Sequence, residues 1–326
     1  MSVPSQSVAP GAGAKKAPRP RSAPQPPAPV ETSLTSGEAR RIATEHGLRP
    51  MGVRPPFGEY VRSLWGYRSF IQVLATSKAY AKNRNNYLGQ FWTILTPILN
   101  AAVYIIIFGF VIGTRKGIEN VIAFIVIGTF VFRFFEHSVS SGAKAIRGNL
   151  SLVRSVRFPR AVLPISTVLT ELTIFLPEAV VMCVITFGAG FVPGLGPVPI
   201  TWKWLLLPGA IALLWVFNTG CAFFMARWVA VAPDVQNLIG FAMRFIMYGS
   251  GVLFSIDHFV GNETIAGLLQ HQPVAVFLYL FRACLANEPT IHMSLSIWLW
   301  AAGWAVAVFA AGFVYFWRGE ERYGRD

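Results

Sequence analysis

Residues 295–317 read LSIWLWAAGWAVAVFAAGFVYFW, a run that contains no charged residue. A helix needs about 20 apolar residues to cross the hydrocarbon core of a bilayer, so this run predicts a transmembrane helix. The whole chain of 326 residues is 54% hydrophobic and 13% charged, whereas a soluble domain usually carries about 25% charged residues. Because charge is costly in lipid, the composition predicts an integral membrane protein.

Five other long apolar segments precede this run. They cover residues 91–113, 121–141, 162–187, 204–226 and 235–256. Together with residues 295–317 they predict an all-α integral membrane protein with six transmembrane helices. Residues 274–285 are also apolar but are too short to cross, and Pro273 precedes them. They predict a re-entrant half-helix before the last span, which requires cover from other parts of the protein.

The chain before the first span divides into two parts. Residues 1–56 are rich in Pro, Ala, Ser and Gly, a composition that buries too little apolar surface to order and predicts a disordered cytoplasmic tail. In residues 57–90, apolar residues recur every three or four positions among basic ones. This pattern predicts an amphipathic helix that lies in the membrane interface. Residues 91–326 then form the six-span domain.

The distribution of basic residues predicts how the spans are oriented. With the N-terminus inside, the inner segments hold 22 of the 28 Lys and Arg residues, and the outer loops hold Arg115, Lys116, Lys203 and Arg282. Cytoplasmic loops carry an excess of Lys and Arg. We therefore expect a multi-pass protein of the inner or plasma membrane with both termini in the cytoplasm. The inner segments counted are residues 1–90, 142–160, 226–234 and 318–326.

The sequence lacks the common motifs of catalysis and metal binding. It has no G-x-x-x-x-G-K-[ST] loop to hold ATP phosphates and no H-E-x-x-H or G-x-S-x-G motif. Cys183, Cys221 and Cys284 are far apart and show no metal-ligand spacing. The net charge of +13 would favour nucleic-acid binding, but the basic residues cluster at the ends of apolar runs. These features favour a transport protein without a metal over an enzyme or a nucleic-acid-binding protein.

Charged residues inside the predicted spans are candidate functional groups, because they are expensive in lipid. They are Arg133, Glu136, Glu171, Glu178 and Arg244. Arg133 and Glu136 are three residues apart and can pair on one helix face. Glu171 and Glu178 are seven apart and also share a face. Two interpretations remain open, namely a proton relay and a structural role in pairing with Arg133 or Arg244.

Aromatic residues make up 14% of the chain, and several lie in the middle of predicted spans. Sugar rings present C–H faces that stack on aromatic rings, so these residues are candidates to line a conduit for a polysaccharide. The alternative is ordinary packing against neighbouring helices or lipid. The candidate conduit residues are Tyr104, Phe108, Phe130, Phe134, Phe245 and Tyr248.

Three motifs resemble one known family, the permeases of polysaccharide ABC exporters, which export O-antigen, teichoic acid or galactan. Residues 78–99 read KAYAKNRNNYLGQFWTILTPIL, similar to the family's entry into its first span, although Thr96-Pro97 replaces its Asn-Pro. Residues 149–164 read NLSLVRSVRFPRAVLP and resemble its loop between spans two and three. Gln272-Pro273 followed by Phe281-Arg282 is similar to its Asn-Pro and Tyr-Arg region. The Ala/Pro/Arg-rich tail favours an actinobacterial cell-wall galactan exporter.

The resemblance implies a half-transporter. Two copies of the chain form the conduit, and two separate ATPase subunits hold ATP and Mg and dock on the cytoplasmic side. The cargo is a polysaccharide on a polyprenyl-pyrophosphate carrier. Within this interpretation, Arg68, Lys82 and Arg84 bind the carrier phosphate or lipid headgroups. The residues expected to couple to the ATPase are Arg154, Arg157, Phe158, Pro159, Arg160, Arg227 and Asp234.

Within residues 149–164, Pro159 disfavours helical geometry at Phe158, so we expect a short helix that ends before this pair. Such a helix could transmit a push from a partner, and Phe158 is expected to matter more than any single arginine. Two other functions remain open. One is an ABC permease for a drug, haem or a small lipid, and the other is an ion-coupled secondary transporter that uses Glu171, Glu178 and Arg133.

Overall fold

The computed structural model describes the chain in two units, residues 1–51 and residues 52–326. The described residues are 38, 41, 42, 45, 55–82, 89, 91–107, 118–256, 263–286, 288 and 291–322. The predicted tail, residues 1–56, therefore lies almost wholly outside them. Among the described residues the regular structure is helical and contains no strand, which confirms the all-α class.

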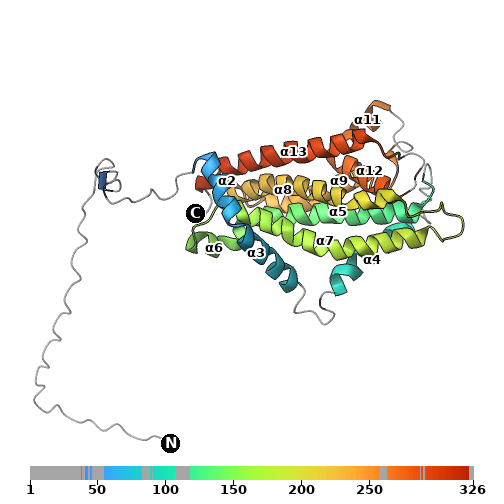
Figure 1. The fold of residues 1–326 in the computed structure, drawn as a ribbon, viewed down its shortest axis with the longest axis horizontal. Coiled ribbons are helices and arrows are strands. Elements are labelled where there is room, and N and C mark those ends of the chain that lie inside the picture. Colours follow the sequence, from blue (N-terminus) through green and yellow to red (C-terminus); the bar gives the residue numbers. More distant parts are fainter. Residues whose placement is uncertain are drawn as a thin grey trace, which may run out of the picture. The chain divides into compact units, whose positions relative to one another are not determined.

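Four long helices run side by side in the second unit (Figure 1). They are α5 (Val121–Ala143), α7 (Val162–Ala189), α8 (Leu207–Val231) and α13 (Leu295–Arg318). The side chain of Asn120 caps α5 by accepting a hydrogen bond from the Ala123 N–H at 3.0 Å, and Ser294 caps α13 in the same way. Each of the four is long and apolar enough to cross a membrane, α8 together with the turn η3 (Trp202–Leu206) before it.

The expected count of six spans is not confirmed. In the predicted first span the structure describes α4 (Phe91–Tyr104), and residues 108–117 lie outside the described part. The predicted fifth span contains α9 (Val235–Gly249), which has only 15 residues. By length and composition, the described residues provide four candidate spans, or five if one bent helix pair is counted as a span.

That bent pair consists of α11 (Glu263–His271) and α12 (Pro273–Leu285), whose axes differ by 77°. Pro273 is the first residue of α12, and Gln272 before it is extended, so the helix breaks there. Almost every side chain of α12 is buried by the rest of the protein, as a half-helix at membrane depth requires. Arg282 belongs to this buried helix. The expectation that Arg282 lies in an outer loop is therefore wrong.

The segment before the first span forms α2 (Phe57–Gly66) and α3 (Arg68–Ala81), which meet at Tyr67. The ring of Phe57 lies 5.9 Å from Phe313 and 5.4 Å from Trp317 of α13. In α3, the backbone carbonyl of Ala75 accepts a hydrogen bond from Thr170 of α7. One side of each helix thus packs on the long helices, while the other side exposes residues such as Trp65, Val73 and Tyr80.

Helices α8 and α13 pack through two glycines. A Cβ atom on Gly312 would lie 2.4 Å from the carbonyl oxygen of Gly220, and one on Gly220 would lie 2.6 Å from the backbone nitrogen of Phe309. Contacts this short involve backbone atoms, so the helices would have to separate. Small residues allow such close approach between helices in membranes.

We predict that Gly312→Ala destabilises the protein by about 1–3 kcal/mol, because the added methyl group forces α8 and α13 apart. Thermal unfolding in detergent measures the loss. Gly303→Ala, in the same helix, is the matched control, since no described atom lies within 4 Å of a Cβ built there. Equal stability of the two variants would contradict this account of the packing.

Candidate functional site

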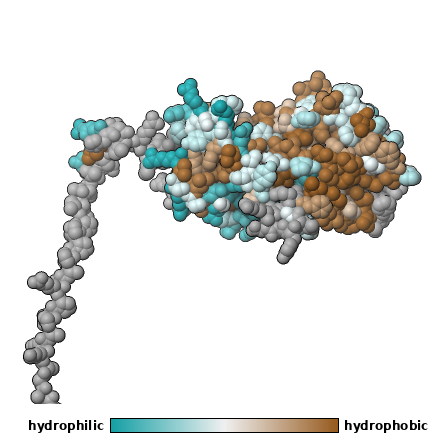
Figure 2. Space-filling view, turned by 60° about the horizontal axis from the view of Figure 1, so that its bottom comes forward, coloured by the Kyte–Doolittle hydropathy of each residue, from teal (hydrophilic) through white to brown (hydrophobic). Residues whose placement is uncertain are grey.

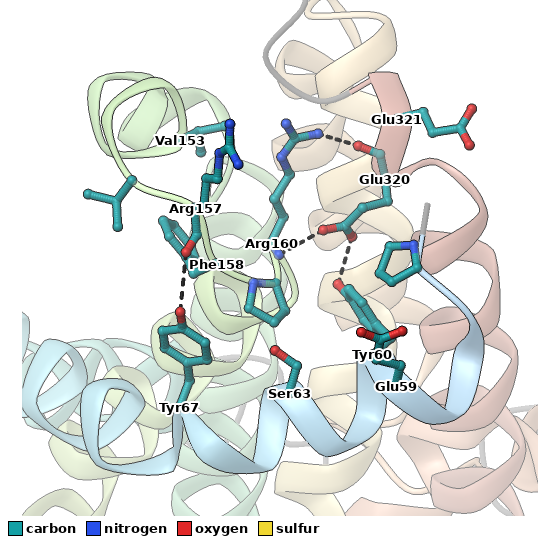
Figure 3. A pocket seen from close by; sticks show the side chains of 13 residues that line it. Glu59, Tyr60, Ser63, Tyr67, Val153, Arg157, Phe158, Arg160, Glu320 and Glu321 are labelled. Carbon is teal, nitrogen blue, oxygen red and sulfur yellow. Dashed lines mark hydrogen bonds between the residues drawn. The ribbon is translucent and has the colours of Figure 1, made fainter. Parts of the chain in front are cut away.

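One end of the second unit brings together parts of the chain that are far apart in sequence. Helix α6 (Leu150–Ser155) follows the short turn η2 (Arg147–Asn149) and lies near α2 and the C-terminal end of α13 (Figure 1). Hydrophilic residues gather at this end, and hydrophobic residues cover most of the remaining length of the face shown in Figure 2. A cavity of about 360 Å³ opens here between α2, residues 153–160 and the turn η4 (Glu320–Arg322) (Figure 3).

The backbone of residues 156–161 forms an irregular bridge between α6 and α7. Val156 is extended, with φ −127° and ψ 139°, so α6 ends at Ser155. Helix α7 begins at Val162. Pro159 lies between these helices and disfavours helical geometry at Phe158. The structure therefore confirms a short helix that ends before the Phe158-Pro159 pair.

The predicted coupling residues of α6 and this bridge differ in exposure. Arg154 and Arg157 are exposed, Phe158 and Arg160 are half-buried, and Pro159 is buried. The ring centroid of Phe158 lies 6.0 Å from that of Phe70 on α3. Phe158 therefore anchors the bridge on α3, whereas the side chains of Arg154 and Arg157 face the outside.

Hydrogen bonds fix the bridge at both ends (Figure 3). The hydroxyl of Tyr67 donates to the carbonyl oxygen of Arg157 at 3.2 Å. At the other end, the backbone N–H of Arg160 donates to Oε1 of Glu320 at 2.9 Å, and the Arg160 guanidinium donates to the Glu320 carbonyl. The Tyr60 hydroxyl donates to Oε2 of Glu320 at 2.6 Å and accepts from the Ala161 N–H at 3.1 Å.

Sequence reasoning missed Glu320 as a functional residue and treated Tyr60 only as part of an apolar face. No local pattern connects them, because they are 260 positions apart. The available signal was weak: a carboxylate three residues beyond the end of a predicted span, in a segment otherwise counted only for its basic residues. The contact exists because α2 packs on the end of α13.

The second predicted coupling region is the turn between α8 and α9. Asp234 is exposed at the residue before α9. Arg227 instead lies against α13, with its guanidinium 3.9 Å from the ring centroid of Tyr315 and a hydrogen bond to the Tyr315 carbonyl. Within the protomer, Arg227 therefore joins α8 to α13.

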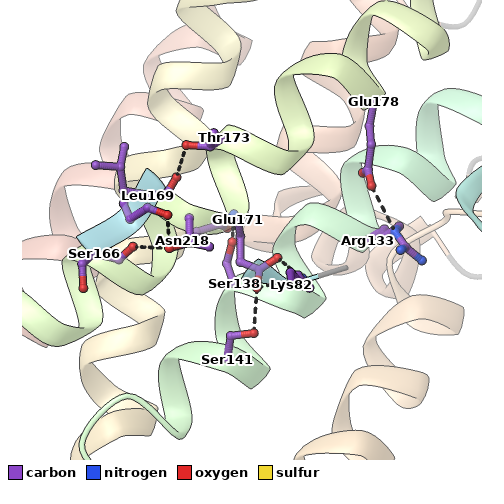
Figure 4. A network of polar contacts seen from close by, with 12 residues as sticks. Lys82, Arg133, Ser138, Ser141, Ser166, Leu169, Glu171, Thr173, Glu178 and Asn218 are labelled. Atoms are coloured by element: carbon purple, nitrogen blue, oxygen red, sulfur yellow. Dashed lines mark hydrogen bonds and ion pairs between the residues drawn. The ribbon is translucent and has the colours of Figure 1, made fainter. Parts of the chain in front are cut away.

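Three of the predicted intramembrane charges, Arg133, Glu171 and Glu178, form ion pairs between segments (Figure 4). Nε of Arg133 lies 3.7 Å from Oε1 of Glu178. Nζ of Lys82 lies 2.9 Å from Oε2 of Glu171, whose other oxygen accepts a hydrogen bond from the Ser141 hydroxyl at 2.9 Å. These contacts support the structural interpretation of both carboxylates. The partner of Arg133 is on another helix, and the expected pair with Glu136 on its own helix is not among the ion pairs of the described residues.

Of the residues predicted to bind carrier phosphate or lipid headgroups, Arg68 and Lys82 lie at opposite ends of α3. Lys82 already pairs with Glu171. The Arg68 guanidinium lies 5.9 Å from the ring centroid of Trp65. Arg84 lies outside the described residues. Arg244, the remaining predicted intramembrane charge, is exposed on α9.

The predicted conduit aromatics also separate into groups. Phe130 and Phe134 are buried inside the protomer, and Phe134 stacks on Phe175 at 4.6 Å. The side chains of Phe245 and Tyr248 are 76% and 52% exposed on α9. Within the protomer, Phe130 and Phe134 are core residues, while α9 presents an aromatic surface. The other two candidates are Tyr104, which is half-buried, and Phe108, which lies outside the described residues.

The described part of the chain contains no group of three or more His, Cys, Asp or Glu side chains that could hold a metal ion. The site consists instead of an anchored basic bridge and a mixed polar cavity. Such an arrangement can dock another protein.

Comparison with known proteins places the chain in a family. Residues 71–286 match the ABC-2 type transporter family, so the chain belongs to this family. It is 27% identical over 250 residues to the O-antigen export system permease protein RfbA of Myxococcus xanthus, a match that covers 74% of this chain and 93% of that protein. A protein of the same name from Klebsiella pneumoniae is 24% identical over 233 residues, covering 71% of this chain and 86% of that protein.

Proposed function

We propose that this chain is the transmembrane subunit of an ATP-driven ABC transporter that exports a lipid-linked polysaccharide across the inner or plasma membrane. Membership of the ABC-2 family supports the transporter class, and the names of the relatives support the cargo. The observation that carries the proposal is the basic segment made of Arg154 in α6 and the bridge at residues 156–161. It exposes Arg154 and Arg157 while folded contacts hold its backbone in place.

The transporter contains two copies of this chain and two copies of a separate ATPase subunit. ATP and Mg belong to the ATPase, because this sequence contains no P-loop. The bridge, the start of α2 and the end of α13 lie at the same end of the long helices. Arg160 and Arg227, from two of the predicted inner segments, contact Glu320 and Tyr315 at this end, and we assign it to the cytoplasm, with both termini.

The cargo is a polysaccharide on a lipid carrier, and the Ala/Pro/Arg-rich tail favours the galactan type. The exposed aromatic residues of α9, Phe245 and Tyr248, support this class of cargo, because aromatic faces stack on sugar rings. The ion-coupled alternative is less well supported, because Glu171 and Glu178 each pair with a cation. A proton relay needs carboxylates that can release and accept protons during transport.

The experiment is affinity purification of the tagged chain from its own membranes. We predict that a P-loop ATPase co-purifies and that Arg154→Glu with Arg157→Glu reduces its recovery about tenfold, since charge reversal at a docking surface produces repulsion. Arg62→Glu on the exposed side of α2 is the matched control and should retain the ATPase.

Depletion of the chain tests the cargo. An exporter of lipid-linked polysaccharide should leave that glycan to accumulate inside depleted cells. An unchanged glycan pool would favour the small-molecule ABC permease. Transport by the purified chain alone, driven by a proton gradient, would contradict the proposal and favour the ion-coupled transporter.

A further inference from the structure

The contacts around Glu320 join parts of the molecule that the proposed function requires to move together. The carboxylate receives the hydroxyl of Tyr60 from α2 at 2.6 Å and the N–H of Arg160 from the bridge at 2.9 Å. Glu320 itself follows the last residue of α13, Arg318, by two positions. One side chain therefore connects α2, the bridge and the last long helix (Figure 3).

The hydroxyl of Tyr60 links Glu320 to the residue before α7. It donates to Glu320 and accepts from the N–H of Ala161, one residue before α7 begins. Its side chain is only 1% exposed, so the hydroxyl cannot exchange these partners for bulk water without a local opening. Buried polar groups that are fully hydrogen-bonded fix one geometry. A displacement of the bridge would therefore reach α2 and α13 through Tyr60 and Glu320.

The contacts of Glu320 fix the geometry of this region more than they stabilise the fold. Burial raises the pKa of its carboxyl above the ordinary value, although the hydrogen bonds from Tyr60 and Arg160 and the charge of Arg160 act to lower it. The charged form is thus less favourable here than in water. Aromatic contacts of Phe57 with Phe313 and Trp317, at 5.9 and 5.4 Å, hold α2 on α13 independently of the carboxylate.

We infer that Glu320, with Tyr60, is a positioning residue that transmits movement of the partner-docking bridge to α2 and α13. This inference rests on the proposed function, because it assumes that an ATPase pushes on the bridge. Glu320→Gln removes the charge and replaces one of the two acceptor oxygens with an amide N–H₂, so that either the Tyr60 hydroxyl or the Arg160 N–H loses its acceptor. Tyr60→Phe removes only the hydroxyl. Both substitutions leave the aromatic contacts of Phe57 in place.

The test measures export per ATP hydrolysed in the complex of the full chain with its ATPase, in membranes. Glu320→Gln and Tyr60→Phe should each lower this ratio by about tenfold, within the range usual for coupling between sites. The double variant should fall no further than the more affected single variant, because both act through one contact. The amount of complex should remain that of the unsubstituted protein.

Glu45→Gln is the matched control, since it makes the same chemical change at an exposed position of the N-terminal unit. If Glu320→Gln lowers the yield of complex, Tyr60→Phe alone carries the test. A lower thermal midpoint with an unchanged export ratio would show a merely structural contact and overturn the inference alone. Failure of the unsubstituted chain to bind any ATPase would overturn the proposed function, and the inference with it.

Discussion

Phe158→Ala is expected to stop export while ATP hydrolysis by the complex continues. The ring of Phe158 rests on Phe70 of α3, 6.0 Å between centroids, and belongs to an apolar cluster with residues of α6 and α13. Truncation leaves a gap between the bridge and α3. Movement of the bridge would then no longer be transmitted to α3. Loss of 1.4 kcal/mol of coupling already corresponds to about a tenfold change.

The backbone contacts of the bridge explain why this variant should still fold and insert. Tyr67 continues to hold the carbonyl of Arg157, and Glu320 continues to hold Arg160. Export in cells and ATP hydrolysis by the purified complex are measured together. Arg154→Ala is the comparison, since Arg154 is exposed and one charge fewer at a docking surface should cost less. Full export by Phe158→Ala would show that the segment of residues 149–164 serves only to orient the protein in the membrane.

Arg282→Met is expected to cause a large loss of stability. The side chain is 2% exposed and donates hydrogen bonds to the carbonyls of Gly251 at 3.0 Å and Val252 at 2.9 Å. It also donates to the carbonyl of Phe124 at 3.3 Å and lies over that residue's ring. Gly128 makes room for it, because a Cβ there would lie 2.8 Å from Nη2 of Arg282.

Methionine fills much of the same volume but removes the donor that Arg282 supplies to the carbonyls of Gly251 and Val252. Each unsatisfied buried group costs about 1–3 kcal/mol, so a total loss on the order of 3 kcal/mol is expected. At roughly 2–4 °C per kcal/mol, thermal unfolding in detergent should shift by several degrees or more.

Arg282→Lys should also be destabilised, because an ammonium group lacks the planar fork that reaches carbonyls on different segments. Arg62→Met is the matched control: it removes an arginine from the exposed side of α2 and should unfold at the original temperature. If Arg282→Met unfolds at the same temperature as this control, the guanidinium is not what joins α12 to α5 and the segment after α9.

Much of the fold could be predicted because its signals are local. Long apolar runs with few charges predict helices that cross lipid, and the long helices α5, α7, α8 and α13 each lie within or around such a run. Pro273 and the short apolar segment after it predicted the half-helix α12 and its need for cover. Pro159 predicted the end of α6 before the bridge. Each of these effects depends on residues within one or two helical turns.

The site could be predicted only in part, because its contacts depend on how distant helices pack and not on local signals. Lys82 was assigned to phosphate binding, but the path of α3 along α7 brings it to Glu171. Phe130 and Phe134 were assigned to a conduit, but both face the interior of the protomer. A residue's position in a span indicates its depth, whereas its partner depends on which way the helix is rotated and which helix packs against it.

The sequence by itself therefore determined the class of the protein, the placement of its long helices and the family it belongs to. Hydropathy, proline positions and short motifs follow directly from residue order. Only the tertiary structure decided that Glu320 meets Tyr60 and Arg160, and that Arg282 is a buried donor instead of a loop charge. These contacts join residues 30 to 260 positions apart, and packing of the helices selects them from many arrangements with the same local pattern.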